Sequence, residues 1–159
     1  MDKWIAYLTI LLLSCLYVTA GAQDSIPPVS KSSAKKAVIN LSKSLESGKS
    51  DESVALDYEA LAKTLALQGE FKKAESYLVN ARKLFHKLHN REKTALIDRE
   101  IGRMQEAQGK IQEAILSYNN AGRLSEDKAF KELNMNDANR LKNISDPIKQ
   151  SPYIQKNIE

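Results

Sequence analysis

The sequence predicts an all-α protein in which helical hairpins stack side by side. Apolar residues recur at steps of three and four from Ala34 onward, and no stretch alternates as a strand would. Segment 55–84 is also similar to segment 95–124, which indicates an internal repeat. At 159 residues, with a mostly apolar start, the chain is sufficient for one modest domain and too short for a two-domain enzyme.

The N-terminus predicts a secretory signal peptide covering residues 1–22. A short head with one Lys precedes the apolar run 5–18, and small residues at 20–22 favour cleavage before Gln23. The alternative is lipidation of Cys15, because the sequence Leu-Leu-Ser-Cys resembles a bacterial lipobox. Either route predicts export, most simply to a bacterial periplasm. The run is shorter than the ~20 residues of a spanning helix, so we expect membrane contact only through this peptide or a lipid on the cysteine.

The rest of the chain divides into three parts. Residues 23–33 contain a Pro-Pro pair and several Ser and predict a linker. Residues 34–145 predict the helical repeat domain, and 146–159 a tail or the start of a further repeat. Beyond residue 22 there is no Cys, which excludes disulfides and thiolate metal sites there. Basic and acidic residues are interleaved, so the net charge of +4 does not predict a nucleic-acid partner.

The repeat has an offset of 40 residues and predicts two units, about 52–88 and 92–124. Each unit is interpreted as helix, Gly-centred turn, helix, because Gly69 and Gly109 can adopt the left-handed conformation that ends a helix. Alanines recur where two helices must approach closely. The identical pairs are Ala55/Ala95, Leu56/Leu96, Gln68/Gln108, Gly69/Gly109, Ala74/Ala114, Asn80/Asn120, Ala81/Ala121 and Leu84/Leu124.

The individual helices follow in order. Segment 34–47 matches the second helix of a leading half-repeat. Ser50 predicts the cap of the next helix, which should run to about Gln68, and His89-Asn90 predicts a turn and a cap between the units. The first unit carries two apolar stripes: Tyr58, Leu61, Ala62 and Leu65, then Phe71, Ala74, Leu78, Ala81, Phe85 and Leu88. Ser125 predicts the cap of a last helix holding Phe130, Leu133, Ala138 and Leu141.

These residues resemble the tetratricopeptide repeat (TPR). Gly69, Ala74, Leu78 and Ala81 fall at the spacing of its Gly, Ala, bulky and Ala positions, and the second unit repeats them. The resemblance covers about 54–124 and implies a short right-handed α-solenoid, although the usual TPR length is about 34 residues. Signal peptide, linker, repeats and the segment 136–141 together resemble the exported N-terminal sensor region of bacterial two-component histidine kinases.

The sequence gives no support for catalysis, a metal or a cofactor. His86, His89 and Glu92 form the one metal-like constellation, and a solvated surface is the simpler interpretation because structural metal sites usually need four ligands. No Gly-x-Ser-x-Gly elbow and no Gly-rich phosphate loop occurs. No acidic residue forms an isolated pair flanked by apolar residues, as acid–base catalysis would require.

The predicted binding surface is a charged strip on the first helices of the units. It consists of Glu59, Lys63, Arg99, Arg103 and Glu106. In stacked repeats such helices line a concave face, and we expect a protein or peptide partner there, with acidic segments favoured. The alternative is an ordinary solvated face. The predicted function is an exported, non-enzymatic TPR scaffold for protein–protein interaction, or alternatively a truncated or stand-alone sensor input region related to a two-component histidine kinase.

Overall fold

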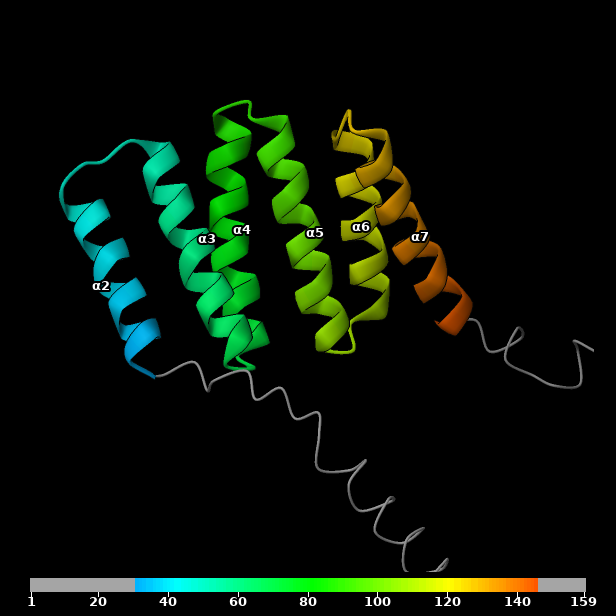
Figure 1. The fold of residues 1–159 in the computed structure, drawn as a ribbon, viewed down its shortest axis with the longest axis horizontal. Helices are drawn as coiled ribbons and strands as arrows, with labels where there is room; N and C mark the ends of the chain where they lie inside the picture. The colour runs from blue at the N-terminus through cyan, green and yellow to red at the C-terminus, as the bar shows by residue number, and fades with distance from the viewer. Residues whose placement is uncertain (1–30, 146–159) are drawn as a thin grey trace, which may run out of the picture.

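The computed structural model describes residues 31–145. Within this range the chain forms six α-helices and no strand, which confirms the all-α prediction (Figure 1). The helices are α2 (Lys31–Glu46), α3 (Asp51–Leu67), α4 (Phe71–Lys87), α5 (Arg91–Ala107), α6 (Ile111–Leu124) and α7 (Lys128–Ser145). Helix α2 begins inside the predicted linker 23–33. The predictions for residues 1–22 and 146–159 lie outside the described residues.

The helices stand side by side in one row, which confirms the predicted stacking (Figure 1). Each packs mainly against the helix before it and the helix after it in the chain. Four consecutive helices begin at Asp51, Phe71, Arg91 and Ile111, at a constant interval of 20 residues. The 40-residue repeat is therefore two such intervals, each a helix followed by a tight turn.

Four turns share one geometry. Gly48 (φ 61°), Gly69 (φ 76°), His89 (φ 55°) and Gly109 (φ 73°) adopt the left-handed conformation. The N–H of the next residue in each case donates to a carbonyl five residues earlier, as in Glu70 N to Leu65 O at 3.0 Å. The two predicted Gly turns are confirmed. His89 occupies the same position between the units, although a non-Gly residue there costs about 1–2 kcal/mol.

Two of the three predicted helix caps are confirmed. Ser50 Oγ accepts from Ser53 N at 3.4 Å, and Asn90 Oδ1 accepts from Lys93 N at 3.0 Å. The cap predicted at Ser125 is wrong. Helix α7 begins three residues later, where an Asp side chain fills this role: Asp127 Oδ1 accepts from Phe130 N at 3.0 Å. An Asp caps as well as a Ser, so the sequence did not distinguish the two.

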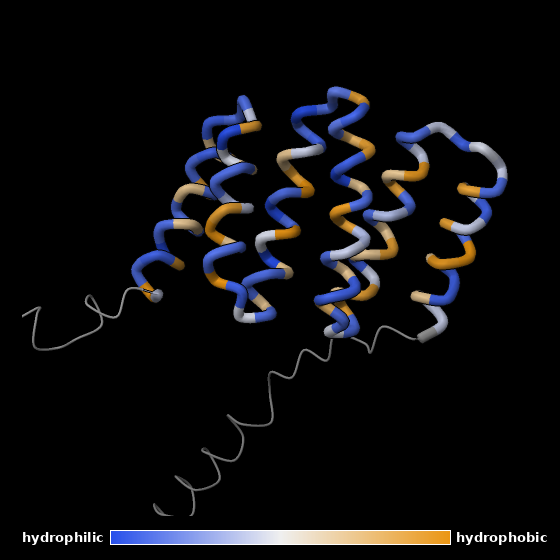
Figure 2. Tube along the Cα trace, turned by 180° about the vertical axis from the view of Figure 1, so that it is seen from behind, coloured by the Kyte–Doolittle hydropathy of each residue, from blue (hydrophilic) through white to orange (hydrophobic). Residues whose placement is uncertain are grey.

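The side chains of the predicted apolar stripes form most of the core. In α4 the buried side chains are Ala74, Leu78, Ala81 and Phe85, spaced at steps of four and three. Leu88 lies just past the end of that helix and is 42% exposed, so its place in the seam was predicted wrongly. Figure 2 shows apolar stretches recurring along every helix between hydrophilic ones. The alanines at 74, 81, 114 and 121 are fully buried, which lets neighbouring helices approach closely.

Candidate functional site

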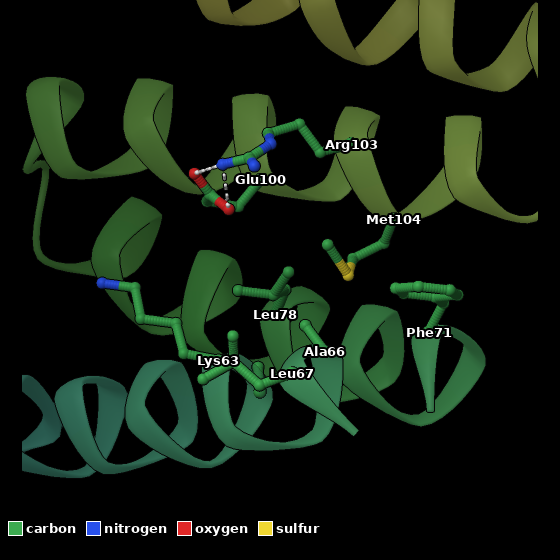
Figure 3. A pocket seen from close by; sticks show the side chains of 9 residues that line it. Lys63, Ala66, Leu67, Phe71, Leu78, Glu100, Arg103 and Met104 are labelled. Carbon is green, nitrogen blue, oxygen red and sulfur yellow. Dashed lines mark hydrogen bonds and ion pairs between the residues drawn. The ribbon is translucent and has the colours of Figure 1, made fainter. Parts of the chain in front are cut away.

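One groove lies between α3 and α5, with α4 at its floor. Its volume is about 440 Å³, and it is lined by Ala62, Lys63, Ala66, Leu67, Phe71, Leu78, Glu100, Arg103 and Met104. Figure 3 shows Leu78 between Lys63 on one side and Glu100 with Arg103 on the other, while Phe71 stands at one end. Leu78 and Met104 are buried, whereas Leu67 is 64% exposed beside the groove. We call this the apolar groove.

Charged side chains surround the apolar groove, and each is paired. Lys63 Nζ donates to Glu59 Oε1 one turn earlier in α3. Arg103 Nη1 lies 3.3 Å from Glu100 Oε1 within α5. Both cations are more than half exposed, and exposed pairs of this kind contribute only about 0–1 kcal/mol. Replacing these ion pairs with ion pairs to a ligand therefore costs little free energy.

A second groove lies between α5 and α7, with α6 at its floor. It has a volume of about 380 Å³ and is lined by Arg99, Arg103, Glu106, Ala107, Tyr118, Asp137 and Arg140. Five lining positions correspond to those of the apolar groove at the 40-residue offset: 63/103, 66/106, 67/107, 78/118 and 100/140. Arg103 lines both grooves. We call the second one the arginine groove.

Hydrogen bonds between helices hold the arginine groove. Arg140 Nη1 and Nη2 donate to the two oxygens of Glu106, at 2.9 and 3.1 Å, and the Tyr118 hydroxyl donates to Glu106 Oε2 at 2.9 Å. Arg99 Nη1 lies 2.9 Å from Asp137 Oδ2, and its guanidinium sits 5.6 Å from the centre of the Tyr118 ring. Three guanidiniums and two carboxylates thus share one groove.

The contacts of this network set the charge states of Glu106 and Tyr118. The hydrogen bond from Arg140 lowers the pKa of Glu106, with burial acting in the opposite direction. Burial, and then the bond to Glu106, raise the pKa of Tyr118. Glu106 is therefore ionised and Tyr118 neutral at physiological pH.

The predicted strip is divided between the two grooves. Lys63 and Arg103 line the apolar groove; Arg99, Arg103 and Glu106 line the arginine groove. Glu59 lies beside the first as the partner of Lys63. Lys63, Arg99 and Arg103 do not present a continuous row of unpaired positive charges, because each is paired with a carboxylate. Arg99 is only one-fifth exposed and links α5 to α7. Partner binding by these residues stays a prediction.

Sequence reasoning missed an ion pair between α4 and α5 in which the carboxylate is buried. Arg82 Nε pairs with Asp98 Oδ1, and Asp98 is only 3% exposed. Burial raises the pKa of Asp98, and the charge of Arg82 offsets part of this effect. Asp98 follows Leu96-Ile97 directly, and this apolar flank was the available signal. Within the described chain, Asp98 Oδ2 has no hydrogen-bond partner.

The two histidines do not converge with acids on a metal site. Glu92 instead accepts hydrogen bonds from Ser125 Oγ at 3.1 Å and from Glu126 N at 3.0 Å. Across residues 31–145, no group of three His, Cys, Asp or Glu side chains is placed to hold a metal ion. In the same range, no helix is both long and apolar enough to span a bilayer.

The structure is a helical-repeat domain that carries the apolar groove and the arginine groove. Residues 34–126, more than half of the chain, match the family model described as the Suppressor of spindle checkpoint defect 1 C-terminal domain. The chain belongs to this family. Neither the comparison with curated proteins nor the comparison with solved structures gave a match.

The family match corrects two predictions. The resemblance to an exported bacterial TPR sensor region is wrong, because the matched family is of a eukaryotic type. The predicted function as an exported TPR scaffold or a histidine-kinase sensor input is wrong for the same reason. The physical cause is that Gly69 and Ala74, like their counterparts one repeat later, meet needs common to all stacked helical hairpins. Such positions indicate a fold and do not distinguish families.

Proposed function

We propose that this chain is a non-catalytic domain that binds a short segment of a partner protein in the apolar groove. The observation that carries the proposal is Leu67, a large apolar side chain that is 64% exposed at the edge of a groove whose floor is Leu78. A partner that covers both an exposed apolar side chain and the apolar groove beside it removes apolar surface from water, and this favours binding.

The lining favours a protein segment over a small metabolite. Small-molecule sites combine an apolar wall with a few fixed polar groups that orient the ligand. The polar groups of the apolar groove are Lys63, Glu100 and Arg103, which stand at the rim and pair with neighbours on their own helices. The floor carries only apolar side chains. Such a groove accepts an apolar side chain and leaves the backbone of its segment at the charged rim.

Family membership adds a cellular context to the proposal. The family is named for a suppressor of a spindle checkpoint defect. A role of this chain in such a checkpoint is a proposal that rests on the family match alone.

The test is a matched pair of surface variants. A displayed library of random peptides of about twelve residues is selected against the full chain, and the selected peptides are measured by fluorescence anisotropy. Leu67→Asp should weaken binding at least about tenfold, because burying one leucine contributes about 1.5–3 kcal/mol. Leu116→Asp is the control, since Leu116 is also 64% exposed but lines neither groove. Selection of no peptide, or equal losses in both variants, would contradict the proposal.

A further inference from the structure

The two grooves occupy equivalent positions of the repeat, but one is mainly apolar and the other is lined mainly by charged side chains. Ala66 and Leu78 of the apolar groove correspond to Glu106 and Tyr118 of the arginine groove. Glu100 of the first corresponds to Arg140 of the second, which reverses the charge at that position. A second reversal occurs at Glu59 and its counterpart Arg99. One face of the row therefore presents an apolar groove followed by a cationic one.

We propose that the partner segment carries an apolar side chain for the apolar groove and Asp or Glu side chains for the arginine groove. This inference rests on the proposed function, and it names the chemistry of the partner. Arg103 joins the two grooves because it lines both and is 58% exposed. Its guanidinium presents a fork of N–H donors that matches a carboxylate.

The charges of the arginine groove leave Arg103 available to a partner. Asp137 and Glu106 are already engaged by Arg99 and Arg140 from a neighbouring helix. Arg103 instead pairs with Glu100 of its own helix, at 3.3 and 3.5 Å, in an exposed position. A partner carboxylate can replace such an exposed contact at little cost. Arg140 is 45% exposed, so it can contact the same ligand from the opposite wall.

The spacing of the grooves fixes the spacing within the partner. Packed helices lie about 8–10 Å apart, so grooves one hairpin apart are separated by roughly 10–20 Å. An extended chain covers about 3.3 Å per residue. The acidic residues should therefore lie about three to six residues from the apolar one. Because the contacts are exposed, their contribution should fall as ionic strength rises.

The peptides selected from the random library test this directly. We expect them to share one large apolar residue with Asp or Glu about three to six residues away. The double variant Arg103→Gln/Arg140→Gln should bind such a peptide about three- to tenfold more weakly. Arg103→Gln alone should show part of this loss, and it breaks no contact between helices. The control is Arg91→Gln/Arg123→Gln, which removes the same charge outside both grooves.

The outcomes bear differently on the proposed function and on the acidic character of the partner segment. Peptides that depend on Leu67 but show no acidic preference, and bind the arginine variants normally, overturn this inference and leave the proposed function standing. Equal losses in the control double variant reduce the effect to general charge attraction and also overturn the inference. Failure to select any peptide overturns both. Peptides that lose binding when their own Asp or Glu become Asn or Gln, and only on the chain with intact arginines, support it.

Discussion

Replacing Gly102 with alanine should destabilise the protein, although alanine is the better helix former. A Cβ at Gly102 would lie 3.1 Å from Cδ1 and Cε1 of Tyr118 and 3.3 Å from its Cγ. The ring cannot withdraw easily, because it is 2% exposed and its hydroxyl donates to Glu106. Overpacking a core costs about 1–3 kcal/mol, whereas Gly to Ala in a helix gains about 1 kcal/mol. The expected net loss is up to about 2 kcal/mol.

The first repeat shows how the clash is relieved. Position 62 is alanine and position 78 is leucine, so the corresponding pair there is Ala62 with Leu78. Tyr118→Leu alone should lose stability, since it removes the hydrogen bond to Glu106. In that background, however, Gly102→Ala should be stabilising by about 0.5–1 kcal/mol, because the steric cost has gone and the helix preference remains.

Urea denaturation followed by circular dichroism of the four chains measures this coupling. We expect an interaction free energy of about 1–3 kcal/mol between the two substitutions, with the double variant more stable than the sum of the single changes predicts. Additivity to within about 0.5 kcal/mol would refute the reasoning. So would a stabilised single Gly102→Ala variant, because the close approach to the Tyr118 ring would then carry no cost.

Three further outcomes follow from the turns and ion pairs. His89→Gly should raise the free energy of unfolding by about 0.5–1 kcal/mol in urea titrations, because His89 has a φ of 55°, while the control His86→Gly, within α4, should lower it by about 1 kcal/mol. Burial raises the pKa of Asp98, so the folded state favours the protonated side chain. The stabilisation from this side chain is therefore complete below the ordinary Asp pKa range and is lost as pH rises through the folded pKa. Asp98→Asn should therefore gain stability relative to the unaltered chain as pH rises above the ordinary Asp range, and a pH-independent difference would contradict this. The pKa of Glu106 is lowered, so its contribution to stability is present at neutral pH and is lost as pH falls through the folded pKa. Glu106→Gln should therefore cost about 0.5–1.5 kcal/mol near pH 7, and the cost should shrink as pH falls below the ordinary Glu range, as measured by a series of thermal melts.

The fold could be predicted because its determinants are local. Gly69 and Gly109 end helices through their own backbone conformation, and the seam of α4 follows from steps of three and four along one helix. The exceptions lie at helix ends. Leu88 continues the period but falls after α4 has ended, and Ser125 and Asp127 compete for the same capping position with similar preference.

The grooves could be predicted only in part because their contacts cross between helices. Register alone places Lys63 and Arg103 on corresponding positions, and both indeed line the apolar groove. The partners of the charges depend on how far apart the helices stand and how they are rotated, and a one-dimensional pattern does not contain this. Arg140 reaches Glu106 across 34 residues of sequence. The pair of Arg82 with the buried Asp98 depends on the same packing of neighbouring helices.

The repeat separates the residues that hold the row together from those that face the grooves. Identical pairs such as Ala74/Ala114 and Ala81/Ala121 are fully buried, and Gly69/Gly109 shape the turns, so stacking constrains them. Helix packing constrains the residues that line the grooves less strongly. At one such position the repeat has Glu100 in the first unit and Arg140 one repeat later, which have opposite charges. In the arginine groove, Arg140 and Tyr118 both donate to Glu106, whose side chain is 31% exposed. The divergence of the two grooves therefore replaces apolar side chains with a hydrogen-bonded network that joins α5, α6 and α7.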